Sequence, residues 1–204
     1  MVAPLARPAP LGVMDVNKAS HLLFGATAGA FAAAELGAPL VAGAAVGAVA
    51  GLAPDVDHPG STLGRQLPRA YHALTPGHRG PTHTVEWCAL LGWGIARLLP
   101  YAGVGQGWAA VIGWAAFAGA CSHLLADLLT EQGIPATMLL VLTRRLRIGF
   151  GFLRGGRLRL PRWLAIRTGG WAEPVVTVVA VALGLVTLGG WWPHLATWVQ
   201  GRIG

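Results

Sequence analysis

Long apolar stretches alternate with polar loops along this chain. The apolar stretches cover 22–34, 39–53, 84–99, 106–130 and 174–192, and glycine, proline or charged residues bound most of them. Helices that are apolar on every side occur in membranes or deep inside large proteins. We therefore predict an all-α fold, a polytopic membrane helical bundle of about five short helical segments.

The first two of these segments are short for a membrane crossing. At 1.5 Å per residue each reaches only about 20 Å, whereas the hydrocarbon core of a bilayer is about 30 Å thick. Glu35, Gly37 and Pro39 interrupt the apolar pattern between them. We expect a hairpin of two helices that is re-entrant, tilted or covered by other helices.

The remaining segments define the domain organisation. A proline-rich, flexible lead is expected over residues 1–20, without the apolar core of a cleaved signal peptide. A single membrane-embedded helical domain follows over 21–193, and a short tail over 194–204. Within the domain, 143–168 is an arginine-rich excursion, and its part 148–160 has the alternating pattern of a small hairpin or an irregular amphipathic segment.

Composition supports the membrane assignment. Of the 204 residues, 54% are hydrophobic and only 11% are charged, against about 25% charged in soluble domains. Thirty glycines suit helices that approach closely in a bilayer, and nine tryptophans are candidates for interfacial anchors. Cys88 and Cys121 both lie in apolar stretches, where we expect small core residues and neither a disulfide framework nor a thiolate zinc site.

The basic residues are clustered. The formal net charge is +7, and eight arginines fall in the excursion. Cytoplasmic loops of membrane proteins carry such an excess. Threading the helices accordingly places the 55–83 and 131–173 loops together at the cytoplasmic face of the inner membrane. The pattern favours anionic membrane lipid as a partner over nucleic acid, and it gives no oligomeric state.

Three carboxylate or imidazole side chains follow the second apolar segment within four positions. Asp55, Asp57 and His58 come at a helix end, directly before Pro59. Oxygen ligands beside a nitrogen ligand suit zinc, manganese or iron better than calcium. The alternative interpretation is a capping or turn device, because aspartate before proline is common in turns.

A second polar group precedes the third apolar segment. His78 and His83 are five residues apart, with Arg79 between them. An imidazole there could hold a metal while the guanidinium binds a phosphate oxygen, and Thr82 is a candidate N-cap of the following helix. The alternative is a basic loop at the membrane surface with incidental histidines.

The most informative pair lies near the end of the fourth segment. His123 and Asp127 are four residues apart, so they share one face of a helix and can reach the same ion. Ionisable residues embedded in a membrane segment are costly and indicate a functional site by default. The alternative is a hydrogen-bonded pair that ties two helices together.

Two further candidates sit at helix ends that the threading brings to the same face. His21 begins the first apolar segment, and Glu173 precedes the proline that opens the last one. We predict a site for a divalent metal, with zinc favoured and manganese or iron as alternatives. The predicted ligands are His21, Asp55, Asp57, His58, His83, His123 and Asp127.

Four of these motifs, in this order, resemble those of a known family. They are His21-Leu22-Leu23-Phe24-Gly25, the stretch Leu52 to Pro59 around Asp55 and Asp57, the stretch His78 to Thr84, and His123 to Thr130. They look like the successive motifs of the YdjM-like family of inner-membrane proteins, described as metal-dependent hydrolases. The resemblance extends over about residues 20–180. It implies a distant relation to the all-helical zinc phospholipase C and single-strand nuclease group, whose sites use His, Asp and Glu from several helices.

These observations favour a membrane-bound metal-dependent hydrolase that acts on a phosphoester, such as an anionic lipid, through a metal-activated water. His78 and Arg79 are the substrate-side candidates, and Glu173 or a carboxylate that is not a ligand is the candidate general base. Two alternatives stay open. One is a non-enzymatic membrane protein with a structural metal site, whose basic loop docks anionic lipid, a protein partner or nucleic acid. The other is a transporter or channel, which the gathering of polar residues at one face disfavours.

Overall fold

The computed structural model describes residues 16–68, 79–138, 157–158, 160–161, 165–166 and 172–188. Within these residues the chain forms five α-helices, which confirms the predicted all-α class: α1 (Val16–Glu35), α2 (Leu40–Ala50), α4 (Val85–Leu98), α5 (Gln106–Leu128) and α7 (Ala172–Leu188). The connections contain four 3-10 turns and two very short strands: η1 (Pro54–Asp57), η2 (Gly64–Gln66), η3 (Pro81–His83), η4 (Leu99–Ala102), β1 (Ile134–Pro135) and β2 (Arg157–Leu158).

Helices α1 and α2 form the predicted hairpin. The N–H of Ala38 donates to the carbonyl of Ala33, and the N–H of Gly37 donates to that of Ala34. Gly37 has a φ of 65°, which is the left-handed position that glycine occupies most easily at a helix end. Pro39 follows and prevents the first helix from continuing. Helix α1 begins at Val16, so the predicted flexible lead over 1–20 extends five residues too far.

Small residues allow α1, α2 and α5 to touch through their backbones. A Cβ atom on Gly47 of α2 would lie 2.7 Å from Cα of Gly29 in α1, and one on Gly119 of α5 would lie 2.7 Å from Cα of Gly47. Neither position has room for a side chain. The close approach brings the carboxyl end of α2 against the last turns of α5.

Helices α4 and α5 form a second hairpin, joined by η4 and a left-handed glycine at Gly103. Cys88 and Leu124 are buried between them, and Cys121 packs against the same small core. Both cysteines are free thiols in this apolar interface. The prediction that they are small core residues is confirmed.

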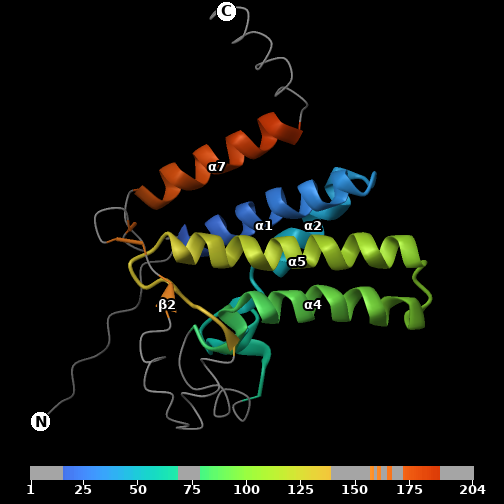
Figure 1. The fold of residues 1–204 in the computed structure, drawn as a ribbon, viewed down its shortest axis with the longest axis horizontal. Helices are drawn as coiled ribbons and strands as arrows, with labels where there is room; N and C mark the ends of the chain where they lie inside the picture. Colours follow the sequence, from blue (N-terminus) through green and yellow to red (C-terminus); the bar gives the residue numbers. More distant parts are fainter. Residues whose placement is uncertain are drawn as a thin grey trace, which may run out of the picture.

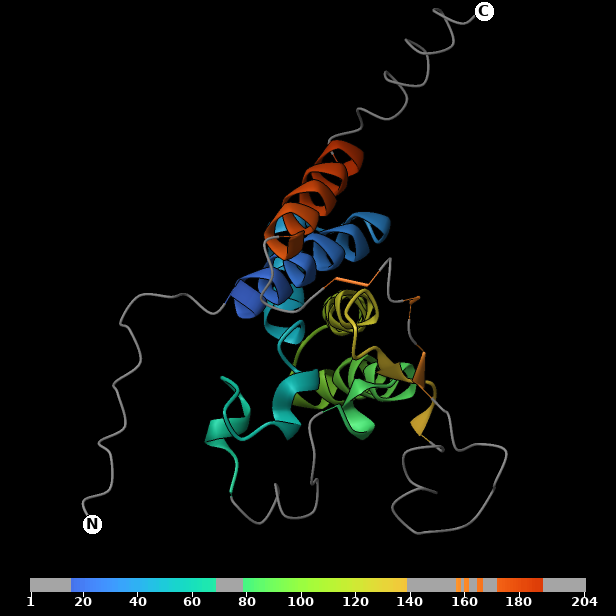
Figure 2. The ribbon, with the colours of Figure 1, turned by 90° about the vertical axis from the view of Figure 1, so that its left-hand side faces the viewer.

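The helices are arranged so that their polar ends meet. Figure 1 shows α4 and α5 lying antiparallel, with α1 between α5 and α7 in that view. The amino ends of α1, α4 and α7 and the carboxyl end of α5 gather at the left of that view. Figure 2 looks at this end of the bundle and shows the η1 and η3 turns beside the end of α5. Among the described residues, His21, Asp55, His83 and His123 all lie at this end or in the turns attached to it.

Within the arginine-rich excursion, the short strand β2 pairs with a strand outside the excursion. Strand β2 pairs antiparallel with β1, so Ile134 faces Leu158 and Pro135 faces Arg157. The sequence predicts a small hairpin or an irregular amphipathic segment over 148–160, and residues 157 and 158 pair with the segment after α5. The rest of that stretch lies outside the described residues.

Two of the described helical stretches are long and apolar enough to cross a membrane, namely Leu40–Asp57 and Gln106–Leu128. At 1.5 Å per residue, the 23 residues of α5 span about 34 Å. The apolar part of α7, Pro174–Thr187, is shorter. Large apolar side chains cover the outer faces of α4 and α7, where Trp93 and Val178 are both more than 60% exposed.

Candidate metal centre

Five of the predicted ligands converge at the polar end of the bundle. His123 and Asp127 lie one turn apart on α5, Asp55 comes from η1, His83 ends η3, and His21 lies in the first turns of α1. The imidazole of His21 stacks on that of His123 with ring centroids 3.7 Å apart. Four separate elements therefore supply one cluster, which is the arrangement expected from their shared position at helix ends.

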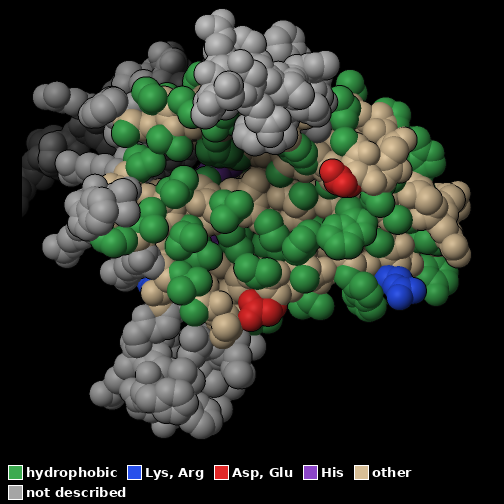
Figure 3. Space-filling model, turned by 45° about the horizontal axis from the view of Figure 1, so that its top comes forward, with side chains coloured by type: hydrophobic (Ala, Val, Ile, Leu, Met, Phe, Trp, Pro, Cys, Tyr) green, Lys and Arg blue, Asp and Glu red, His purple; other side chains and the backbone are tan. Residues whose placement is uncertain are grey.

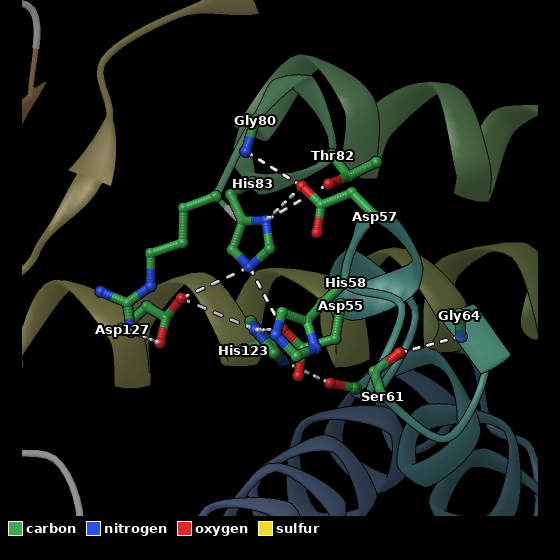
Figure 4. Close-up of polar contacts among 12 residues, drawn as sticks. Asp55, Asp57, His58, Ser61, Gly64, Gly80, Thr82, His83, His123 and Asp127 are labelled. Carbon is green, nitrogen blue, oxygen red and sulfur yellow. Dashed lines mark hydrogen bonds and ion pairs between the residues drawn. The ribbon is translucent and has the colours of Figure 1, made fainter. Parts of the chain in front are cut away.

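Four side-chain atoms face one another at the centre of the cluster (Figure 4). Nε2 of His83 lies 3.4 Å from Oδ1 of Asp55 and 3.6 Å from Oδ2 of Asp127. Nε2 of His123 lies 3.5 Å and 3.6 Å from the same two oxygens. The same four atoms thus form a closed ring in which nitrogen and oxygen alternate.

These separations fit a metal ion. Zinc binds nitrogen and oxygen ligands at about 2.0–2.2 Å in tetrahedral sites, which places neighbouring ligand atoms roughly 3.3–3.6 Å apart. Ligand atoms of His83, His123 and Asp127, and likewise those of His21, Asp55 and His123, all lie within 4.8 Å of one another. The residues present can therefore hold a divalent cation.

The tautomer of His123 supports this interpretation. Its Nδ1 lies 2.7 Å from the carbonyl oxygen of Gly51, which can only accept a hydrogen bond, so Nδ1 carries the proton and Nε2 carries a lone pair. Within the described part of the chain, this buried Nε2 makes no hydrogen bond. A metal ligand needs such a lone pair, and metal-binding histidines usually donate their other N–H to a carbonyl or carboxylate.

Asp57 lies behind His83 and outside this group of four. Its Oδ2 accepts the N–H of Gly80 at 3.0 Å and lies 3.7 Å from Nδ1 of His83. The hydroxyl of Thr82 is 3.2 Å from the same Nδ1. Figure 4 shows both partners on the side of the imidazole that faces away from the centre. Asp57, predicted as a ligand, is therefore placed to orient His83.

The same loop corrects the predicted helix cap. Thr84, and not Thr82, is the N-cap of α4, because its hydroxyl oxygen accepts the N–H of Trp87 at 3.4 Å. Thr84 also donates its hydroxyl hydrogen to the carbonyl of Pro81 at 2.8 Å. Because Thr84 caps the helix, the hydroxyl of Thr82 can contact His83.

Arg79 is anchored at the edge of the cluster. Its Nη2 donates to Oδ1 of Asp127 at 2.6 Å, and its Nη1 donates to the hydroxyl of Thr130 at 3.0 Å and to the carbonyl of Gly133 at 3.1 Å. Its φ of 62° is the only positive value among the described residues other than glycine. Asp127 is thus held by Arg79 through one oxygen and faces the two histidines with the other.

The cluster contains several buried charges, and their balance affects the stability of the site. If the histidines are neutral, three carboxylates and one guanidinium leave two negative charges in a largely buried cluster, and uncompensated buried charges are costly. Burial by itself would lower the pKa of His83, but Asp55 and Asp57 beside it raise that pKa to about 9. A proton on His83 offsets one negative charge, and a divalent cation would offset both.

A small cavity opens onto the cluster. It has a volume of about 140 Å³, and His21, Asp55, Arg79 and Asp127 line it together with residues of α1, α5 and α7. The side chain of Asp55 is 25% exposed, whereas that of His83 is fully buried. The cluster is therefore closed on the His83 side and open on the Asp55 side.

One further predicted ligand is not brought into this group. His58 is exposed, and its Nδ1 accepts the N–H of Gly60 within its own loop. His78 and the side chain of Glu173 lie outside the described residues. The roles predicted for these two residues stay predictions.

Several residues that support the site were not anticipated. They include the carbonyl of Gly51, the hydroxyl of Thr130, and the pair Ser20 and Thr177, whose hydroxyls are 3.0 Å apart. Thr130 follows Asp127 by three positions, and side chains at this spacing are neighbours on a helix. This spacing could therefore have predicted that Thr130 lies beside Asp127. A backbone carbonyl leaves no such trace in a sequence.

Comparison with known proteins agrees with the membrane assignment. No curated protein and no solved structure matches the chain. Residues 14–196, however, match the profile of a family described as YdjM inner membrane protein. The match includes α1 to α7 and all the residues of the cluster. The chain belongs to the YdjM inner membrane protein family.

Proposed function

We propose that this protein is a membrane-bound metal-dependent hydrolase that cleaves a phosphoester, such as that of an anionic lipid. The observation that carries the proposal is the group of four ligand atoms from His83, His123, Asp55 and Asp127, with a cavity that reaches Asp55 and Asp127. Structural metal sites are usually closed, whereas catalytic ones keep one position accessible. The exposed edge at Asp55 supports a catalytic site.

Two nitrogen and two oxygen ligands favour zinc, with manganese or iron as alternatives. When bound, such a cation supplies Lewis acidity, which polarises a substrate oxygen and lowers the pKa of a water molecule toward about 7. The chain's own residues then have separable tasks. His83 and His123 are fixed by contacts to their Nδ1 atoms, and Asp127 is fixed by Arg79.

The reaction also needs a proton acceptor and a group that binds the phosphoryl oxygens. Hydrolysis forms one P–O bond to the water oxygen and breaks the ester P–O bond, and the departing alcohol takes up a proton. Asp57 is a poor candidate for the acceptor because His83 separates it from the centre. Glu173 remains the proposed base, since it belongs to the first turn of α7, whose next turn lines the cavity through Val176 and Thr177. Arg79 and its neighbour His78 remain the proposed substrate-side residues.

The distribution of charge supports a cytoplasmic site in a multi-pass protein. Both loops that carry cluster residues or join them, 55–83 and 131–173, are rich in arginine, and such loops face the cytoplasm. The excess of arginine in these loops would also favour contact with anionic lipid.

The alternative function is a structural metal site in a protein whose basic loop docks anionic lipid, a protein partner or nucleic acid. The near-complete burial of His83, His123 and Asp127 favours it. The two functions differ in what they predict for zinc-loaded protein. Only the hydrolase releases product.

The test is hydrolysis of phosphatidic acid and phosphatidylglycerol by detergent-purified, zinc-loaded protein, with products identified by mass spectrometry. We expect cleavage of at least one of these lipids, loss of cleavage in His83→Ala, and retention in His58→Ala. His58 is the matched control because it is a histidine of the adjacent loop outside the cluster. Zinc-loaded wild-type protein that cleaves neither lipid would support the structural site.

A further inference from the structure

The cavity at the cluster is too small for a whole lipid. Its volume is about 140 Å³, whereas pockets that enclose drug-sized ligands have roughly 300–1,000 Å³. A phosphate-sized group fits, and the rest of any larger ligand has to lie outside the cavity.

The lining of the cavity is mixed. Polar groups of the cluster line it together with Ser20, Thr130, Gln132 and Thr177. Apolar side chains of three helices and of the segment before α7 line it as well, namely Phe24, Ala126, Leu129, Ile166 and Val176. A polar group and a hydrocarbon chain joined to it would each find a matching surface.

Helices α5 and α7 make few contacts with each other and leave a furrow between them, and Ala126 and Val176 line the cavity from these two helices. Helix α7 packs on α1, where Gly184 accommodates Thr27 and the hydroxyl of Thr177 donates to Ser20. Figure 3 shows a hollow with hydrophobic side chains along part of its border and histidine visible inside it. The furrow thus connects the cluster with the outer surface of apolar helices.

A divalent cation would offset the two negative charges of the cluster, and one buried donor then remains for an anionic head group. Arg79 is 7% exposed, lines the cavity, and has its Nε buried without a hydrogen bond among the described residues. Its two terminal nitrogens are occupied by Asp127, Thr130 and Gly133. A phosphoryl oxygen in the cavity could accept the remaining N–H.

We propose that the furrow between α5 and α7 holds a hydrocarbon chain of an amphiphile whose anionic phosphate head enters the cavity, so that the substrate comes from the bilayer and not from water. This inference rests on the proposed function for the chemistry at the head group. The binding of the chain itself depends only on the furrow.

Binding is tested first, without turnover. A phosphatidic acid with a photoactivatable diazirine in its acyl chain is added to the purified protein in detergent, and the labelled residues are mapped by mass spectrometry. We expect labelling of the α5 and α7 residues that border the furrow, around Ala126 and Val176. Ala126→Trp and Val176→Trp fill the furrow and should reduce this labelling at least fivefold.

Matched controls carry the same substitution on lipid-facing positions of the same helices. Leu125 and Val178 are 63% and 66% exposed, so Leu125→Trp and Val178→Trp should leave the labelling unchanged. Melting curves in detergent confirm that each variant is folded. Labelling spread evenly over the outer faces of α4 and α7, or equal loss in the furrow and control variants, would overturn the proposal.

Turnover separates this inference from the proposed function. The furrow variants should lose cleavage of long-chain phosphatidic acid but keep cleavage of a short-chain, water-soluble phosphoester. Equal loss on both substrates contradicts the chain-binding role. If wild-type protein cleaves neither substrate while the furrow is labelled specifically, the hydrolase proposal fails and the amphiphile site stands.

Discussion

Removing the charge of Asp57 should weaken metal binding without abolishing it. The carboxylate is fully buried, accepts the N–H of Gly80 at 3.0 Å and lies 3.7 Å from Nδ1 of His83, on the far side of the imidazole from Asp55 and Asp127. Asp57→Asn keeps the shape and an amide oxygen for Gly80 but removes the negative charge that favours a proton on Nδ1. Nε2 would then carry its lone pair toward the centre less often.

The magnitude follows from the position of Asp57 behind the ligands. Loss of such an orienting group typically lowers metal affinity 10- to 100-fold, which corresponds to about 1.4–2.7 kcal/mol. Asp127→Asn removes a proposed ligand together with the ion pair to Arg79 and should cost considerably more. Asp57→Asn is therefore expected to be intermediate between wild type and Asp127→Asn.

The assay is competition for zinc between the detergent-purified protein and a chromophoric chelator, at a pH where wild-type affinity is well resolved. His58→Ala serves as the control and should match wild type. If Asp57→Asn binds zinc as poorly as Asp127→Asn, then Asp57 is itself a ligand, as its sequence position first suggested. If its affinity is unchanged, the orienting role is refuted.

Other perturbations should have distinct signatures. In metal-free protein the pKa of His83 is raised to about 9, so its imidazolium stabilises the fold fully below its ordinary pKa of 6.5, and this contribution is lost as the pH rises through 9. Because zinc must displace that proton, zinc affinity should rise with pH up to about 9 with release of protons, and a pH-independent affinity between 7 and 9 would refute this. Arg79→Gln leaves the buried charge of Asp127 uncompensated and should destabilise the metal-free protein by about 3–5 kcal/mol, with partial rescue by zinc. Melting curves with and without chelator measure this, and equal melting temperatures in wild type and variant would contradict it. Gly47→Ala should cost about 1–3 kcal/mol because its new Cβ overlaps α1, whereas Gly94→Ala on α4, which has open space, should be neutral or stabilising by up to about 1 kcal/mol. Similar stability of these two alanine variants would refute the close packing.

The parts of the site that follow from helical periodicity could be predicted from the sequence. His123 and Asp127 share a face of α5 because they are four residues apart, and both face the cluster. The convergence with His83 and Asp55 could be predicted as well, because each lies at the end of an apolar segment and alternate crossings return these ends to one side.

The division of labour between Asp55 and Asp57 could not be predicted in the same way. The two residues lie in a 3-10 turn, where each residue advances by about 120°, so positions two apart point in different directions. One carboxylate therefore faces the centre and the other faces the back of His83. The sequence just after a helix does not reveal whether the next residues adopt an α, 3-10 or extended conformation.

Contacts between segments far apart in the chain could not be predicted from the sequence either. The two-residue strands β1 and β2 are too short to leave a periodic pattern, and their pairing joins segments more than 20 residues apart. The anchoring of Arg79 by Thr130 and Gly133 likewise depends on how the loop after α5 returns to the cluster. These features arise from tertiary contacts and not from local preference.

The central claim is that His83, His123, Asp55 and Asp127 hold a divalent metal ion. Metal content by mass spectrometry tests it on detergent-purified wild-type protein, the His123→Ala/Asp127→Ala double variant and the His58→Ala control. We predict a stoichiometric amount of zinc, manganese or iron in wild type and in His58→Ala, and its loss in the double variant. A wild-type protein that remains free of metal after reconstitution, or a double variant that retains the ion, would contradict the account.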